Sequence, residues 1–96
     1  MAQKRYVVEF SRFSAKQIAK LPRGISEAIN LWREAVERLG LPQVRLAAGY
    51  HDELLKEQRQ GQRSVRLNRA YRLIYVQMNK VEIVIVGVLE VNKHDY

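Results

Sequence analysis

Three apolar segments separated by short turns dominate the second half of the sequence. They span residues 63–67, 71–78 and 81–91 and are rich in Val, Ile, Leu and Tyr. The turns, residues 68–70 and 79–80, are too short for a crossover connection, so consecutive strands must run antiparallel. The last segment is apolar on both faces through its middle, which is typical of an interior strand. The pattern therefore predicts an antiparallel β-meander.

The first half of the chain combines a strand with two helices. Alternating side chains over residues 5–10 predict the strand. Ser14 followed by Gln17 fits a capping box and predicts a short helix over residues 15–21. Apolar side chains then recur at spacings of four and three, which predicts a longer helix whose buried stripe consists of Ile25, Ile29, Trp32, Val36 and Leu39.

Gly40 and Pro42 end this helix, because they supply a left-handed cap position and a residue without an amide donor. Over residues 41–62 the periodicity fades, and we expect a long connection with at most a helical turn. Long connections of this kind in compact domains are usually functional.

The chain as a whole is predicted to be one α+β domain over residues 1–96, with the strand and helical hairpin preceding the β-meander. With 96 residues and 47% hydrophobic content, it is large enough for one core and too small for two domains. No apolar run is long enough to cross a bilayer and no signal-peptide pattern opens the sequence, so we expect a cytoplasmic protein with no membrane partner. The absence of cysteine excludes disulfides and thiolate metal sites.

Positive charge is concentrated between residues 56 and 72. The chain has 17 Lys and Arg against 10 Asp and Glu, a net charge of +7, which indicates a polyanionic partner such as RNA, DNA or an acidic protein. Arg72 shares a strand face with Ile74 and Val76, so it must either leave the core or find a partner for its charge. The alternative is a solvated basic face balanced by Glu82, Glu90 and counterions.

Few residues offer other chemistry. Asp52 and Glu53 lie beside the arginines, where an acid is more often a salt-bridge partner than a catalytic base. His51 and His94 are the only histidines, too few for a persuasive metal site. RNA cleavage without a metal needs a base for the 2′-hydroxyl, cations for the phosphate and an acid for the 5′-oxygen. No nucleotide-binding, nucleophile-elbow or zinc motif is present, and we expect no cofactor and no metal.

Four short motifs stand out in the sequence: YVVEFS at residues 6–11, KLP at 20–22, YRLIY at 71–75 and EVNKHDY at 90–96. Together with the order of the elements they resemble the RelE/ParE superfamily of bacterial type II toxins, and within it the RelE/YoeB branch. The resemblance implies the RelE-like fold, cleavage of mRNA in the ribosomal A site, arrest of translation, and neutralisation by a cognate antitoxin.

The resemblance also implies roles for particular residues. Glu53 would be the general base, Arg66 and Arg72 would stabilise the scissile phosphate, His94 would stabilise charge or donate a proton, and Tyr96 would orient the A-site nucleotide. His51 competes with Glu53 for the role of base. Four further cations would contact RNA phosphates: Lys56, Arg63, Arg69 and Lys93.

The sequence thus predicts a metal-free, ribosome-dependent mRNA endonuclease that leaves 2′,3′-cyclic phosphate ends. Two alternatives stay open. The first is a ParE-like inhibitor of DNA gyrase, with the same fold and no RNA cleavage. The second is a non-catalytic module that binds RNA or the ribosome, for which Glu53 and His94 would be dispensable.

Overall fold

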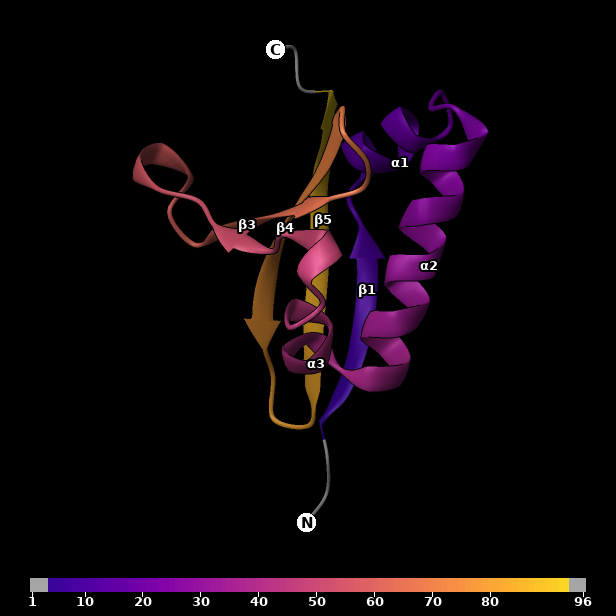
Figure 1. Ribbon diagram of the computed structural model, residues 1–96. Coiled ribbons are helices and arrows are strands. Elements are labelled where there is room, and N and C mark those ends of the chain that lie inside the picture. The colour runs from indigo at the N-terminus through magenta and orange to yellow at the C-terminus, as the bar shows by residue number, and fades with distance from the viewer. Residues whose placement is uncertain (1–3, 94–96) are drawn as a thin grey trace.

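A five-stranded mixed sheet forms the centre of the computed structural model, which describes residues 4–93 (Figure 1). The strands lie in the order β1-β5-β4-β3-β2. They comprise β1 (Arg5–Phe10), β2 (Glu53–Leu54), β3 (Gln62–Arg66), β4 (Tyr71–Asn79) and β5 (Ile83–Lys93). β1 runs parallel to β5, and every other neighbouring pair is antiparallel. The predicted α+β class and β-meander are confirmed, and β5 is an interior strand.

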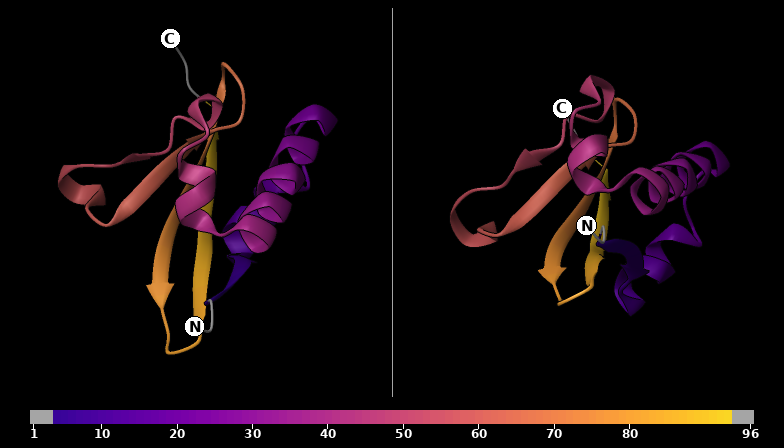
Figure 2. Two further views of the ribbon diagram at one scale, coloured as in Figure 1. Left: turned by 60° about the horizontal axis from the view of Figure 1, so that its bottom comes forward. Right: turned by 90° about the horizontal axis from the view of Figure 1, so that it is seen from below.

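Three helices and two short 3₁₀ turns complete the described chain. They are α1 (Arg12–Ile18), α2 (Arg23–Leu39), α3 (Leu41–Arg45), η1 (Ala48–Tyr50) and η2 (Glu57–Arg59). Buried side chains of α2 and α3 join those of β3, β4 and β5 in one cluster, so both helices cover the same face of the sheet (Figure 2). No helix within residues 4–93 is long and apolar enough to span a membrane.

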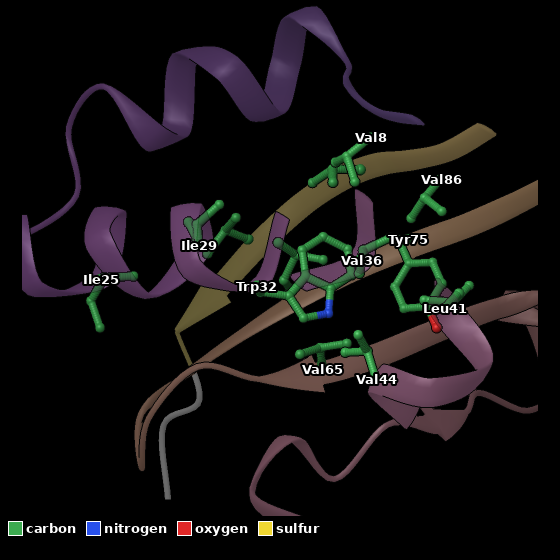
Figure 3. Close-up of a cluster of buried hydrophobic side chains, with 13 residues drawn as sticks. Val8, Ile25, Ile29, Trp32, Val36, Leu41, Val44, Val65, Tyr75 and Val86 are labelled. Atoms are coloured by element: carbon green, nitrogen blue, oxygen red, sulfur yellow. The ribbon is translucent and has the colours of Figure 1, made fainter. Parts of the chain in front are cut away.

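Trp32 of α2 lies at the centre of the hydrophobic core. Its side chain is fully buried, and its ring is 5.5 Å from the ring of Tyr75 on β4. Figure 3 shows it among Val36, Val65 and Tyr75. The predicted stripe is correct for its first four members but wrong for Leu39, which is 54% exposed at the end of the helix.

The first helix begins earlier than predicted, and the proposed capping box is wrong. Ser11 is the N-cap, and its hydroxyl accepts a hydrogen bond from the Ser14 amide at 3.0 Å. The Ser14 hydroxyl donates to the Val88 carbonyl at 3.1 Å, and the Gln17 side chain accepts from the Val91 amide at 2.7 Å. Since β1 ends opposite Val88, Gln17 satisfies an amide of β5 beyond the end of β1. The Ser14 hydroxyl adds a second hydrogen bond to the Val88 carbonyl, which already accepts from the Ser11 amide.

The segment predicted as a long connection is more structured than expected. Gly40 ends α2 as predicted, with a positive φ of 88°, and an added Cβ would lie 3.1 Å from the Tyr6 ring. Pro42 does not end the helical region, since it lies in the first turn of α3. The later part of the segment contains β2, which pairs with β3 at only two positions.

Candidate functional site

The alternation of side chains divides β3 and β4 into two chemically different faces. Val65 on β3, and Leu73 and Tyr75 on β4, point toward the helices and belong to the core. The intervening residues point to the opposite face, where Ser64 pairs with Ile74 and Arg66 pairs with Arg72. This second face carries Glu53, Arg66 and Arg72 of the predicted site.

Arg72 is held on this face by three neighbours. Its Nε donates to the Ser64 hydroxyl at 2.5 Å, and its Nη2 donates to Glu53 Oε1 at 2.9 Å. The same Nη2 lies 3.5 Å from the backbone carbonyl oxygen of His51. Ser64 is buried and the Arg72 side chain is only 16% exposed, so the guanidinium is fixed in direction. Of the two possibilities that the sequence leaves open for Arg72, leaving the core or finding a partner for its charge, the structure shows a partner, Glu53.

Arg66 lies directly across from Arg72 in the β3–β4 ladder, on the same face. Within residues 4–93 it makes no ion pair of its own. Like charges at directly opposed positions repel and destabilise a sheet. An anion bound between the two guanidinium groups would remove this cost, so the arrangement favours phosphate binding.

A groove of about 400 Å³ opens beside Arg72. Leu55 and Ile74 give it apolar walls, and Asn92 of β5 adds an amide. Arg59 also borders the groove and forms an ion pair with Glu90 at 2.5 Å. The residues that line it are Glu53, Leu55, Arg59, Ser64, Arg72, Ile74 and Asn92. The groove therefore combines hydrogen-bonding groups with apolar surface, as a nucleotide would require.

Asp52 is directed to the other face of the sheet, into a buried polar cluster. Its Oδ1 accepts from Arg63 Nε at 2.6 Å, and its Oδ2 accepts from the Tyr75 hydroxyl at 2.5 Å. Arg45 Nε donates to the same hydroxyl at 3.4 Å. Burial, with the hydrogen bond to Asp52, raises the pKa of Tyr75 well above its ordinary value.

The predicted residues near this cluster differ in the face of the sheet that they occupy. Arg63 lies on the helix-covered face and its charge is paired with Asp52, so the structure does not bring it to the groove. Asp52 is a salt-bridge partner, as its position beside arginines predicts, and Glu53 faces the groove. His51 adjoins the groove through its carbonyl oxygen and is itself exposed.

The remaining predicted residues lie outside the groove or outside the described chain. Lys56 is exposed at the start of η2, Arg69 is exposed in the turn between β3 and β4, and Lys93 is exposed at the end of β5. His94 and Tyr96 lie outside the described residues. Ser64 and Asn92 are site residues that the sequence reasoning missed, and only the strand register could have placed them beside Arg72.

The groove offers acid-base and anion-binding chemistry. The Glu53 carboxylate is 65% exposed and can accept a proton from a bound hydroxyl group. Arg72, with Arg66 across the strand pair, can stabilise negative charge on a phosphate. No cluster of three or more potential metal ligands occurs in the described part of the chain.

Comparisons with known proteins identify the fold. No protein-family model matches the sequence, and no curated protein matches it either. Among solved structures, YafQ from E. coli superposes with a TM-score of 0.73 at 17% identity, covering 94% of each chain. The YoeB/ParE toxin from Agrobacterium tumefaciens gives 0.68 at 20% identity, covering 95% of this chain and 99% of that one.

An archaeal RelE, solved in complex with RelB from Pyrococcus horikoshii, also gives 0.68 at 20% identity, covering 92% of this chain and 93% of that one. The chain has the RelE-like fold. In this RelE-like fold the helices cover one face of the sheet, and the groove with Glu53 and Arg72 lies on the other.

Proposed function

We propose that the chain is the toxin of a type II toxin-antitoxin system and acts as a ribosome-dependent mRNA endonuclease. The observation that carries the proposal is the contact between Glu53 and Arg72, 2.9 Å apart on an open groove, with Arg66 directly across from Arg72. A base and a cation on one groove, with a second cation opposite the first on the neighbouring strand, are the groups that attack by a 2′-hydroxyl requires. The RelE-like fold supports the same reading.

The proposed reaction transfers the phosphate within the RNA chain. Glu53 removes the proton of the 2′-hydroxyl, and the resulting oxygen attacks the adjacent phosphorus. Arg72 and Arg66 stabilise the charge that develops on the phosphate oxygens. The bond to the 5′-oxygen breaks as that oxygen takes a proton from His94. The products are a 2′,3′-cyclic phosphate and a 5′-hydroxyl.

Glu53 is a better candidate for the base than His51. The carboxylate of Glu53 contacts the guanidinium of Arg72, so a phosphate held by Arg72 would lie close to it. His51 approaches Arg72 through its backbone carbonyl oxygen instead. The proposal therefore assigns proton removal to Glu53.

The proposed partners are the ribosome with its mRNA and an antitoxin protein, and the proposed place of action is the cytoplasm. A net charge of +7 favours ribosomal RNA as well as an acidic antitoxin segment. The RelE from Pyrococcus horikoshii is itself solved as a complex with RelB. We expect an antitoxin segment to cover the Arg66–Arg72 face and so block access of RNA.

The test is cleavage of a defined mRNA by purified protein, with and without ribosomes whose A site is empty. Primer extension maps the 5′ ends. We expect cuts within the A-site codon only when ribosomes are present. We expect Glu53→Gln to slow this cleavage by about 10²- to 10⁴-fold, to a residual rate that can still be measured, while melting at the temperature of the wild type. Glu27→Gln is the matched control, because Glu27 also pairs with an arginine, Arg23, on an exposed helix face.

Further outcomes separate the alternatives. His94→Gln should slow cleavage, and His51→Gln should cleave as the wild type does. Ribosome binding without cleavage would contradict the enzyme and indicate a binding module. Intact mRNA together with inhibition of gyrase supercoiling would indicate ParE-like activity instead.

A further inference from the structure

Asp52 is buried between two exposed residues of the segment that carries the proposed base. Its side chain is 1% exposed, whereas His51 and Glu53 on either side are exposed. A buried carboxylate is costly unless it is paired and fully hydrogen-bonded. Both oxygens of Asp52 are used, one by Arg63 and one by Tyr75.

Few other bonds fix the backbone around Glu53: the Leu55 amide donates to the Gln62 carbonyl oxygen at 2.9 Å, and Arg72 Nη2 lies 3.5 Å from the His51 carbonyl oxygen. β2 pairs with β3 at only two positions, Glu53 with Ser64 and Leu54 with Arg63. The loop that follows stands away from the rest of the sheet in Figure 1, and most of its residues are exposed. His51 has a positive φ of 42°, a conformation that costs free energy in a non-glycine residue unless its surroundings maintain it.

Both partners of Asp52 are themselves firmly held. Tyr75 is fully buried and packs against Trp32. Arg63 lies within β3, which pairs with β4 over five positions. The carboxylate therefore ties a weakly paired segment to the hydrophobic core through Tyr75 and to the sheet through Arg63.

We propose that Asp52 is a positioning residue of the candidate active site, which holds the Glu53 carboxylate against Arg72 by anchoring the segment to Arg63 and Tyr75. The inference rests on the proposed function, because it assigns a purpose to that geometry. Asp52 itself contacts neither the groove nor the proposed substrate.

The strand register shows why an anchor is needed. Neighbouring residues of a strand point to opposite faces, so a slip of one residue would turn Glu53 to the helix-covered face and Asp52 to the groove face. Both are acids, and either could pair with an arginine, so charge alone does not choose between the two registers. The shorter side chain of Asp52 fits between Arg63 and Tyr75, and this leaves Glu53 for the groove.

The first test is a double-mutant cycle on the ribosome-dependent cleavage rate, at a temperature where every variant is folded by circular dichroism. We expect Asp52→Asn to lower kcat on the order of a hundredfold, the scale on which a misplaced catalytic group reduces a rate, with KM within about twofold of the wild type. In a Glu53→Gln background, Asp52→Asn should cause no further loss. Glu27→Gln serves again as the control and should keep the wild-type rate.

A merely structural role would give a different pattern. It would lower the rate by the same factor with or without Glu53, and that result would overturn the proposal. If Asp52→Asn does not fold, Tyr75→Phe removes only one of the two hydrogen bonds to the carboxylate. It should lower kcat by a smaller factor, again only when Glu53 is present.

A second readout does not depend on activity. The Arg72 Nε–H resonance in a ¹⁵N correlation spectrum reports the contacts of the guanidinium. We expect Glu53→Gln and Asp52→Asn to shift it in the same direction, and Glu27→Gln to leave it in place. An unshifted Arg72 resonance in folded Asp52→Asn would overturn the positioning role. A shift in a protein that cleaves no RNA would support the positioning role and contradict the proposed function alone.

Discussion

At the scale of single residues, the direction of one guanidinium group organises the groove. Arg72 donates through Nε to Ser64 and through Nη2 to Glu53, two bonds that leave the side chain in different directions. Arginine can do this because its donors are arranged in a rigid planar fork. Lysine carries the same charge on a single flexible nitrogen and cannot reproduce the geometry.

Arg72→Lys should therefore separate charge from geometry. We expect cleavage to fall on the order of a hundredfold, the scale at which one pre-oriented donor to a transition state contributes, and Arg72→Ala to abolish cleavage. Both variants should remain folded, since the apolar core lies on the other face of the sheet. Arg23→Lys, at an exposed helix position, is the control. Normal growth arrest by a folded Arg72→Ala protein would refute the assignment.

Because the phenol of Tyr75 is buried, we expect the stability of the protein to depend on pH above about pH 10. Burial and the bond to Asp52 raise its pKa above the ordinary value of 10.0, so the folded protein keeps the phenol neutral where the unfolded chain ionises it. Its contribution to stability is fully present below pH 10 and is lost as the pH rises further, by at most about 1.4 kcal/mol for each pH unit. Urea unfolding from pH 9 to 11 should show a steeper loss for wild type than for Tyr75→Phe. Equal slopes would contradict the burial of a neutral phenol.

At the scale of elements, α2 gives a matched pair of apolar residues on what the sequence presents as one stripe. Trp32 is fully buried, and Leu39 is 54% exposed. We expect Trp32→Ala to lower the free energy of unfolding by about 3–5 kcal/mol. Leu39→Ala should cost about 1 kcal/mol or less, because little of its surface is removed from water. Chemical denaturation measures both, and equal costs would contradict the position of the helix on the sheet.

Periodicity predicted the long elements and missed the short ones. The 17 residues of α2 repeat their apolar spacing often enough to be recognised from the sequence alone, and the 11 residues of β5 include a long apolar run that follows a turn. By contrast, α3 has five residues and β2 has two, too few to establish a period. The start of α1 was misplaced because Ser11 and Ser14 both suit a cap, and only the end of β1 decides between them.

Residue pattern alone indicated only that Arg72, on an apolar strand face, would either leave the core or find a partner, and the structure supplies Ser64 and Glu53. The proposed roles of Arg72 and Glu53 came from the resemblance to the RelE/ParE superfamily. The sequence could not separate Arg63 from the other arginines, because its pairing with Asp52 depends on a contact between residues 11 positions apart. Charge density along a chain does not reveal which face of a sheet a charge occupies.

At the scale of the whole molecule, the helices and the proposed RNA contacts lie on opposite faces of the sheet. The core occupies one face, and the opposed pair Arg66 and Arg72 occupies the other. This separation lets the chain tolerate repulsion between two arginines, since neither belongs to the hydrophobic core. Because of this separation, we expect a substitution of Arg66 to change RNA binding with little effect on the free energy of unfolding.

The dependence of RNA affinity on salt concentration should report how many phosphates this face contacts. For single-stranded RNA, each contact adds about −0.7 to the slope of log K against log salt concentration. We expect Arg66→Gln to reduce the magnitude of that slope by about 0.7, and Arg23→Gln, on an exposed helix position, to leave it unchanged. Fluorescence anisotropy over a KCl series gives both slopes, with Glu53→Gln as the background so that the RNA stays intact. An unchanged slope in Arg66→Gln would show that Arg66 does not contact phosphate, and the affinity would then have to come from cations outside the groove.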